Sequence, residues 1–173
     1  WEIHTNLEDS PKVFSAVIEA GAKPFGMYAL NSMRIEKGYR TWKGDLSTDY
    51  TLLEGGIERF IKFDKPQDFP GKAALLAEKQ QGSKKRFVTL IVDTDFADAP
   101  YMSSIWHGDK VVGETTSGDW GYRINASIAL GMVRSDLAVP GSKLEVEIFG
   151  KRCKAIVQND EALWDPKNER ICA

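Results

Sequence analysis

The 173-residue sequence is poor in the side chains that cross-link small proteins or bind metals. It has two cysteines, Cys153 and Cys172, and two histidines, His4 and His107. A disulfide framework needs several cysteines, and zinc sites need cysteine or histidine pairs at short spacing. This sequence has neither several cysteines nor a closely spaced pair of cysteines or histidines. The sequence therefore excludes a disulfide scaffold and predicts no metal site.

An excess of positive charge is also missing. The 23 Lys and Arg residues are balanced by 25 Asp and Glu, so the formal net charge is −2. Binding to nucleic acids or anionic membranes usually requires a basic field. The densest basic run, Lys84 to Arg86, stands between a helical and a strand-like pattern, and we interpret it as a solvated linker. We expect no nucleic-acid partner and no membrane partner.

Long apolar runs and several catalytic motifs are absent as well. No run approaches the roughly 20 residues of a membrane span, and no secretory signal opens the chain. There is no Walker loop, no G-x-G-x-x-G after a strand and no G-x-S-x-G. We expect a cytoplasmic protein, or a mitochondrial matrix protein if the source is eukaryotic, without a nucleotide site or a serine triad in this chain.

Helical patterns dominate the first half. Apolar periodicity and glycine stops predict helices over 10–21, 27–36 and 72–81. Between the last two, residues 39–70 alternate aromatics and glycines with acids, which indicates short strands and loops. Residues 1–5 alternate like a strand.

Strand patterns dominate the second half. β-Branched or alternating runs occupy 87–92, 105–112, 127–133 and 144–157, the last as a hairpin. Five or six short strands at regular spacing are typical of a small antiparallel barrel or sandwich. We therefore predict an α+β fold whose boundary lies in residues 80–85.

Five motifs carry a resemblance to a known family. Before the boundary they are N-S-M-R-I-E-K-G-Y-R-T-W-K-G-D-L (31–46), L-E-G-G-I (53–57) and F-P-G-K-A-A-L (69–75). After it they are V-G-E-T-T-S-G (112–118) and I-A-L-G-M-V (128–133). In this order they resemble the aminomethyltransferase (glycine-cleavage T-protein) family. The family's patterns are R-L-E-x-G, D-L or D-I, L-E-x-G-L, F-x-G-K/R-x-A-L, G-x-x-T-S-G and I-A-L-G-Y/M-V.

Two further segments narrow the resemblance. K-G-Y-R-T-W at 37–42 and L-W-D-P-K-N-E-R at 163–170 look most like the dimethylglycine and sarcosine dehydrogenase branch. The resemblance implies that residues 1–84 are the C-terminal part of a folate-binding aminomethyltransferase domain. It implies that residues 85–173 are a C-terminal antiparallel β-barrel domain.

The same resemblance implies a function. We expect the tetrahydrofolate-binding portion of a one-carbon (aminomethyl) transferase, in a flavin-linked dimethylglycine or sarcosine dehydrogenase that forms 5,10-methylenetetrahydrofolate. The partners would be folate, a methylated amine and the N-terminal remainder of the parent chain, and FAD would belong only to that remainder. Two alternatives stay open: a non-catalytic folate-binding module, and a folate-dependent N- or S-demethylase without flavin.

The resemblance also places the start of the chain midway through the folate-binding domain, after the family's catalytic aspartate. We therefore predict no catalytic residue in this chain and no aminomethyl transfer by it alone. Glu2 matches the glutamate that accepts hydrogen bonds from the pterin ring in this family, since a carboxylate pairs well with adjacent N–H donors. The structural alternative is a surface glutamate on an edge strand.

Three more residues are candidate folate ligands. Arg34 aligns with the arginine of R-L-E and could hold a folate carboxylate, or could lock the helix through an ion pair with a residue such as Glu54. Tyr39 and Trp42 follow that helix, and their rings could flank the pterin or aminobenzoyl group or pack between domains. Leu30 replaces a second arginine that many T-proteins carry, so part of the tail recognition would differ.

Overall fold

The computed structural model describes residues 2–171 and divides into two compact units, which are described separately. The first unit ends at Leu30 and the second begins at Asn31. Helix α1 (Ser10–Glu19) belongs to the first unit, and helix α2 (Met27–Glu36) runs from its end into the second. Both helices match their predicted positions. None of the helices among residues 2–171 is long and apolar enough to cross a membrane.

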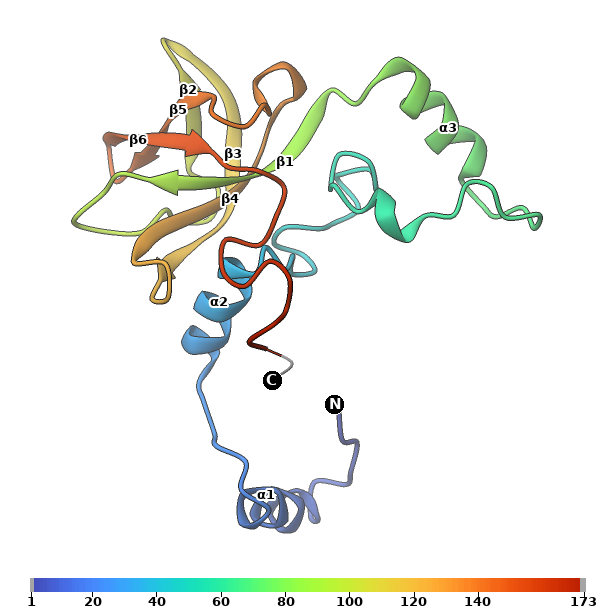
Figure 1. Ribbon diagram of the computed structural model, residues 1–173, viewed down its shortest axis with the longest axis vertical. Coiled ribbons are helices and arrows are strands. Elements are labelled where there is room, and N and C mark those ends of the chain that lie inside the picture. Colours follow the sequence, from blue (N-terminus) through green and yellow to red (C-terminus); the bar gives the residue numbers. More distant parts are fainter. Residues whose placement is uncertain (1, 172–173) are drawn as a thin grey trace. The chain divides into compact units, whose positions relative to one another are not determined.

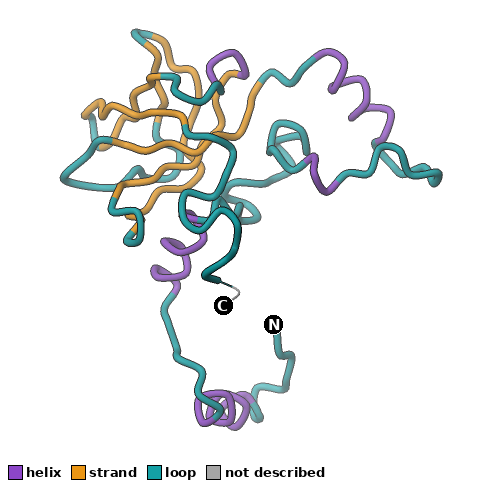
Figure 2. The backbone as a smooth tube through the Cα atoms, in the orientation of Figure 1, coloured by secondary structure: helices purple, strands orange, loops and turns teal. Residues whose placement is uncertain are grey.

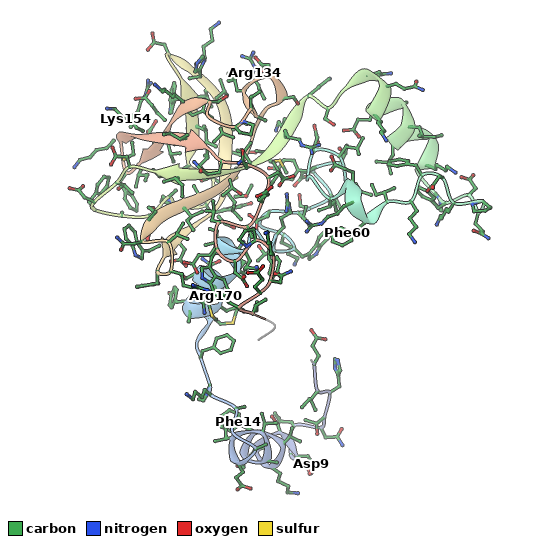
Figure 3. All side chains as sticks on the ribbon, in the orientation of Figure 1. Asp9, Phe14, Phe60, Arg134, Lys154 and Arg170 are labelled. Carbon is green, nitrogen blue, oxygen red and sulfur yellow. The ribbon has the colours of Figure 1, made fainter. Side chains whose placement is uncertain are left out.

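Helix α1 has local start and stop signals. Pro11 occupies its first turn, where a fixed φ suits the helix and the missing N–H has no partner to lose. Gly21 follows the helix with φ +99°, a conformation that glycine adopts without strain. No residue of α1 is buried, and Phe14 stands on its exposed surface (Figure 3).

The predicted strand over residues 1–5 is wrong for its described part. Residues 2–5 form no strand, and Trp1 lies outside the described residues. A strand is stabilised by a ladder of hydrogen bonds to a neighbouring strand. The described residues of the first unit include no other strand that could supply this ladder. Alternation of apolar and polar residues is therefore not sufficient to form a strand at residues 2–5.

The second unit contains a closed antiparallel barrel, which confirms the predicted α+β fold and the barrel alternative (Figures 1 and 2). Its strands follow each other around the barrel in the order β1-β4-β3-β2-β5-β6. The strand bounds are β1 Lys85–Val92, β2 Ser104–His107, β3 Lys110–Gly121, β4 Ala126–Arg134, β5 Lys143–Ile148 and β6 Lys151–Val157.

The barrel has two hydrophobic clusters. Alternate residues of β5 and β6 fill its interior, including Val146 and Ile148. A second cluster lies outside, where Ile128 and Leu130 of β4 pack with Ile35 of α2. Strand β4 is thus covered on both faces, which explains its continuous apolar sequence.

The segment between α2 and α3 (Lys72–Gln81) is irregular, as predicted, but it contains no short strands among its described residues. It has one isolated bridge, between Trp42 and Leu46, and a 3-10 helix at Glu58–Phe60. Its backbone hydrogen bonds are partly local turns, such as those from Asp45 and Leu46 to the carbonyl of Thr41, and partly contacts with the barrel, such as Phe87 N to the carbonyl of Glu54.

The basic run at residues 84–86 is not simply a solvated linker. Lys85 and Arg86 open strand β1. Arg86 donates from Nη1 to the carbonyl of Leu53 at 3.0 Å and from Nη2 to Glu58 at 2.6 Å. Its guanidinium holds the irregular segment against the barrel, because it satisfies an acceptor that has no strand partner.

Candidate functional site

A buried polar cluster joins α2 to the barrel. At its centre is the carboxylate of Asp45, which has no exposed surface. It accepts hydrogen bonds from Arg34 Nη1 at 2.7 Å, Thr41 N at 2.8 Å and Thr41 Oγ1 at 3.2 Å. It also accepts from Thr116 Oγ1 at 2.6 Å and Ser117 Oγ at 2.7 Å. These hydrogen bonds offset the free-energy cost of burying the charged carboxylate.

The guanidinium of Arg34 is engaged on all sides. Besides Asp45, Nη1 reaches the carbonyl of Tyr39 at 3.1 Å. Nε and Nη2 both donate to Asn31 Oδ1, at 3.0 and 2.6 Å, and Nη2 also lies 2.7 Å from Ser117 Oγ. Such a fork of donors suits a rigid internal anchor.

The ion-pair partner of Arg34 differs from the one we named. It is Asp45 and not Glu54, whose carboxylate accepts from the backbone N of Thr51 at 3.2 Å. A folate carboxylate at Arg34 would have to displace one of these internal acceptors. That role therefore stays a prediction.

This cluster brings the recognition motifs together in space. Arg34 and Asp45 come from the first motif, and Thr116 and Ser117 come from the T-S-G motif of the barrel. Gly118 completes that motif on β3, and a Cβ at this position would collide with the carbonyl oxygen of Ala99. The residue types in both motifs thus have a packing explanation.

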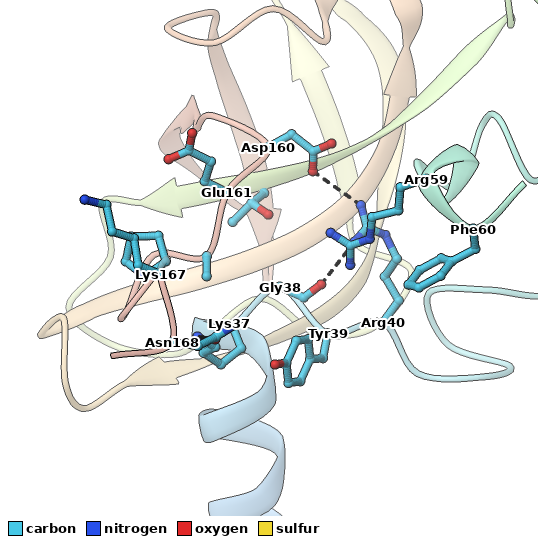
Figure 4. Close-up of a pocket in the computed structure, with 13 residues that line it drawn as sticks. Lys37, Gly38, Tyr39, Arg40, Arg59, Phe60, Asp160, Glu161, Lys167 and Asn168 are labelled. Carbon is cyan, nitrogen blue, oxygen red and sulfur yellow. Dashed lines mark hydrogen bonds and ion pairs between the residues drawn. The ribbon is translucent and has the colours of Figure 1, made fainter. Parts of the chain in front are cut away.

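A cavity of about 630 Å³ lies next to the C-terminal end of α2 (Figure 4). Its walls are formed by residues 37–40 after α2, by Arg59 and Phe60, and by residues 160–162 and 166–168 near the C-terminus. Cavities that hold small organic ligands have volumes of about 300–1,000 Å³. We refer to this space as the α2 cavity.

Arg40 is a largely buried cation of the α2 cavity, with a side chain that is 9% exposed. Nη1 donates to the carbonyl of Gly38 at 3.2 Å, Nη2 lies 3.4 Å from Asp160, and the guanidinium carbon lies 4.1 Å from the centre of the Phe87 ring. Burial lowers the pKa of Arg40, although Asp160 opposes this effect. Its Nε is buried without a hydrogen-bond partner among the described residues.

The other walls add charge and aromatic surface. Lys37, Arg59 and Lys167 bring further positive charges to the α2 cavity, against the acids Asp160 and Glu161. The Arg59 guanidinium carbon lies 4.9 Å from the centre of the Phe60 ring. Tyr39 also lines the cavity and is half exposed. The arrangement suits an anionic ligand that also carries flat rings.

Within the second unit, the structure brings two of the three predicted site residues together. Tyr39 lines the α2 cavity, and Arg34 lies in the polar cluster beside it. Trp42 is 65% exposed and is not among the lining residues. Glu2 lies in the first unit, where it is 89% exposed and its Oε2 is 3.6 Å from His4 Nε2.

Sequence reasoning missed several residues of the site. Asp45, Arg40 and Arg59 were not singled out, although each is a charged residue within or just after the motif region. A charged residue embedded in a family motif was the available signal for Asp45. No signal in the sequence places Arg59 beside Arg40. Among residues 2–171 no group of acids, cysteines and histidines could hold a metal ion.

Two family models match the chain. The glycine cleavage T-protein C-terminal barrel domain matches residues 85–165, and the GCVT N-terminal domain matches residues 1–65. Mitochondrial dimethylglycine dehydrogenase of Mus musculus is 41% identical over 176 residues, which cover 99% of this chain and 20% of that protein. Mitochondrial sarcosine dehydrogenase of Mus musculus is 31% identical over 182 residues. The chain therefore spans about a fifth of the length of these relatives.

A shorter relative and a solved structure are also similar to this chain, and both are aminomethyltransferases. An aminomethyltransferase of Bacillus cereus is 32% identical over 162 residues, covering 91% of this chain and 44% of that enzyme. The crystal structure of glycine cleavage system aminomethyltransferase T from Bartonella henselae superposes with a TM-score of 0.77 at 23% identity. That match covers 86% of this chain and 43% of the other, and it shows the shared fold. The chain belongs to the aminomethyltransferase (glycine-cleavage T-protein) family.

Proposed function

We propose that this chain is the tetrahydrofolate-binding part of a one-carbon transferase of the dimethylglycine or sarcosine dehydrogenase kind. The names of the relatives support the reaction class. The α2 cavity carries the proposal, because it combines aromatic faces with the guanidinium groups of Arg40 and Arg59. The first residue that lines this cavity, Lys37, directly follows the R-I-E motif at 34–36.

The residues of the α2 cavity fit the chemistry of folate. Folate joins a flat pterin and an aminobenzoyl ring to a glutamate with two carboxylates. Arg40 and Arg59 present guanidinium groups, which pair well with carboxylates. Tyr39 and Phe60 offer aromatic surfaces for a flat ring. The cavity has four cationic and two acidic side chains, so its charge also favours an anion.

When bound, tetrahydrofolate would supply the N5 and N10 nitrogens that take up the one-carbon unit. The residues of this chain would bind and orient it: the two arginines would hold the carboxylate end, and Tyr39 would lie against a ring. We propose that Glu2 pairs with the pterin N–H groups. Trp42 stays a candidate for a second ring contact.

A flavin, in the dehydrogenase hypothesis, would be bound by a part of the protein other than this chain. The sequence here has no dinucleotide fingerprint. Oxidation of a methylated amine would occur there, and this chain would handle the folate that captures the product. The mitochondrial names of the dehydrogenase relatives favour the mitochondrial matrix as the location.

Calorimetric titration of tetrahydrofolate tests this proposal, both on this chain and on a longer protein that includes it. We expect saturable binding, and no binding to either protein would contradict the proposal. In the longer protein, folate-dependent oxidation of dimethylglycine or sarcosine supports the dehydrogenase hypothesis. Binding without any turnover would instead identify a folate-binding module, and flavin-independent demethylation would identify the third alternative.

A further inference from the structure

The ammonium group of Lys37 lies between α2 and the C-terminal segment, which we define as residues 158–171. The side chain is buried, with 7% of the residue exposed. Nζ lies 2.7 Å from the carbonyl oxygen of Asp165, 2.7 Å from Asn168 Oδ1 and 3.4 Å from the carbonyl oxygen of Trp164. The three donors of the ammonium thus meet three neutral acceptors on one short stretch of chain.

No carboxylate lies within 4.0 Å of this ammonium among the described residues. A buried charge is costly unless hydrogen bonds compensate it. The three acceptors of the C-terminal segment provide that compensation for Lys37. In turn, the ammonium binds the C-terminal segment, which has no helix or strand among its described residues, to the end of α2.

The C-terminal segment has few other attachments to α2. Trp164 N donates to the carbonyl of Glu36 at 3.1 Å. Leu163 packs on the outer hydrophobic cluster, the Arg123 guanidinium carbon lies 4.0 Å from the centre of the Trp164 ring, and Asp160 lies 3.4 Å from Arg40 Nη2. From Asp165 onward the hydrogen bonds other than those of Lys37 are internal: Asn168 N donates to the carbonyl of Asp165, whose carboxylate accepts from the backbone N of Arg170 and Ile171. Both Asp165 and Asn168 have positive φ, at 48° and 60°, so the loop has a defined but locally strained shape.

The same loop is a wall of the α2 cavity. Pro166, Lys167 and Asn168 line it opposite Tyr39 and Arg40, and Figure 4 shows Lys37 and Asn168 next to each other at its edge. Lys37 therefore touches the loop and the cavity at once.

We propose that Lys37 is a positioning residue that holds residues 164–168 as a preformed wall of the α2 cavity and thereby sets the affinity for its ligand. The proposal rests on the proposed function for the identity of that ligand, tetrahydrofolate. It also connects the two segments that resemble the dehydrogenase branch, at 37–42 and 163–170, because Lys37 belongs to the first and binds the second. A wall that is ordered before binding lowers the entropic cost of binding.

Two measurements on Lys37→Met test this inference. The variant keeps an unbranched side chain but removes the ammonium, and Lys154→Met, at an exposed position of strand β6, is the matched control. In hydrogen exchange, Lys37→Met should speed exchange at Trp164, Asn168 and Arg170, while β5 and β6 stay protected. Tetrahydrofolate affinity should fall about tenfold, and Lys154→Met should change neither quantity.

Lys37→Arg keeps a cation with several donors, so it should recover part of the protection and part of the affinity. Asn168→Ala, which removes one acceptor from the loop itself, should reproduce the Lys37→Met effect more weakly. Should Lys37→Met also expose β5 and β6, Asn168→Ala decides the point, because it leaves α2 and the barrel unchanged.

Unchanged exchange in the C-terminal segment would overturn the positioning role. Faster exchange with unchanged tetrahydrofolate affinity would show that the loop is not a wall of the ligand site, which also overturns the proposal. Absence of tetrahydrofolate binding by the unmodified protein would instead contradict the proposed function, and the exchange result would still decide whether Lys37 holds the loop.

Discussion

Arg34 Nη1 lies 2.7 Å from Asp45 Oδ2, and both side chains are nearly withdrawn from solvent, at 12% and 0% exposure. The carboxylate also accepts from Thr116 and Ser117 of strand β3. One ion pair therefore connects α2, the loop after it and the barrel. This contact is one of those that join the C-terminal part of α2, from Asn31, to the barrel within the second unit.

Replacing Asp45 with Asn should strongly destabilise the protein. The charge of Arg34 would remain buried without its counter-ion, and breaking such a pair costs about 3–5 kcal/mol. Chemical denaturation of the wild type and the variant measures this loss in the free energy of unfolding.

The control is Asp136→Asn. Asp136 pairs with Arg134 at 2.6 Å, but the two side chains are 59% and 54% exposed. Surface pairs of this kind contribute about 0–1 kcal/mol. If Asp45→Asn lowered the free energy of unfolding no more than Asp136→Asn, the polar cluster would not anchor α2 to the barrel.

Gly118→Ala should also reduce stability. The new Cβ would meet the backbone carbonyl oxygen of Ala99, which cannot move like a flexible side chain. Overpacking of this kind costs about 1–3 kcal/mol. Gly26→Ala is the matched control, since its Cβ would have no heavy atom within 4 Å and its φ is not positive. Thermal unfolding should separate the two variants, and similar midpoints would count against the packing explanation of the T-S-G motif.

Tyr50 should ionise late in an alkaline titration. Burial raises the pKa of Tyr50 above its ordinary value, and so does the hydrogen bond from its hydroxyl to Glu114 at 2.9 Å. The folded state thus holds this proton more tightly than the unfolded state. The resulting stability is complete below about pH 10, the ordinary tyrosine value, and is lost as pH rises through the folded-state pKa.

Ultraviolet absorbance measures this ionisation directly. The chain has five tyrosines, and Tyr50→Phe should remove the last component of the titration. Tyr122→Phe, at an exposed position, should leave that component in place. A late component that survives in Tyr50→Phe would show that another tyrosine is responsible.

Glu2→Gln should weaken tetrahydrofolate binding at least about tenfold in a protein that carries this chain within a longer sequence. The change keeps the size but turns one acceptor oxygen into a donor, which would face an N–H of the pterin. About 1.4 kcal/mol corresponds to a factor of ten in affinity. Reduction of a flavin by the amine, if the protein has that half-reaction, should be unaffected. Equal affinities would leave Glu2 as a surface residue.

Local signals made much of the fold predictable. The bounds of α1, α2 and α3 follow from apolar periodicity and glycine stops, and β5 and β6 follow from strict alternation. The stretch over 128–133 is apolar at nearly every position because α2 covers its outer face. Residues 2–5 failed as a strand because pairing depends on a partner elsewhere in the chain.

The site was less predictable because its contacts are non-local. Arg34 was expected to pair with a residue such as Glu54, but Asp45 is the partner, and the choice depends on how the loop turns after α2. The α2 cavity combines residues near position 40 with residues near 160, and no periodic pattern relates such distant segments. Tyr39 was identified through the resemblance, whereas Arg40 and Arg59 emerged only from the structure.

We propose that the α2 cavity binds the carboxylate end of tetrahydrofolate through Arg40 and Arg59. Arg152→Met is the control for Arg40→Met, because Arg152 also stacks on an aromatic ring, at 3.9 Å from the centre of Trp106, but lies outside the cavity. Arg59→Met tests the same claim at an exposed position where folding is not at risk.

Calorimetric titration of these variants with tetrahydrofolate and with tetrahydropterin, which lacks the glutamate, is the most direct measurement. Each charge-assisted hydrogen bond contributes about 1.5–3 kcal/mol. We therefore predict at least about a tenfold loss of tetrahydrofolate affinity in Arg40→Met and Arg59→Met, with tetrahydropterin binding and the Arg152→Met control unchanged. Equal tetrahydrofolate affinities in the wild type and all three variants would show that Arg40 and Arg59 do not bind the carboxylate end of tetrahydrofolate.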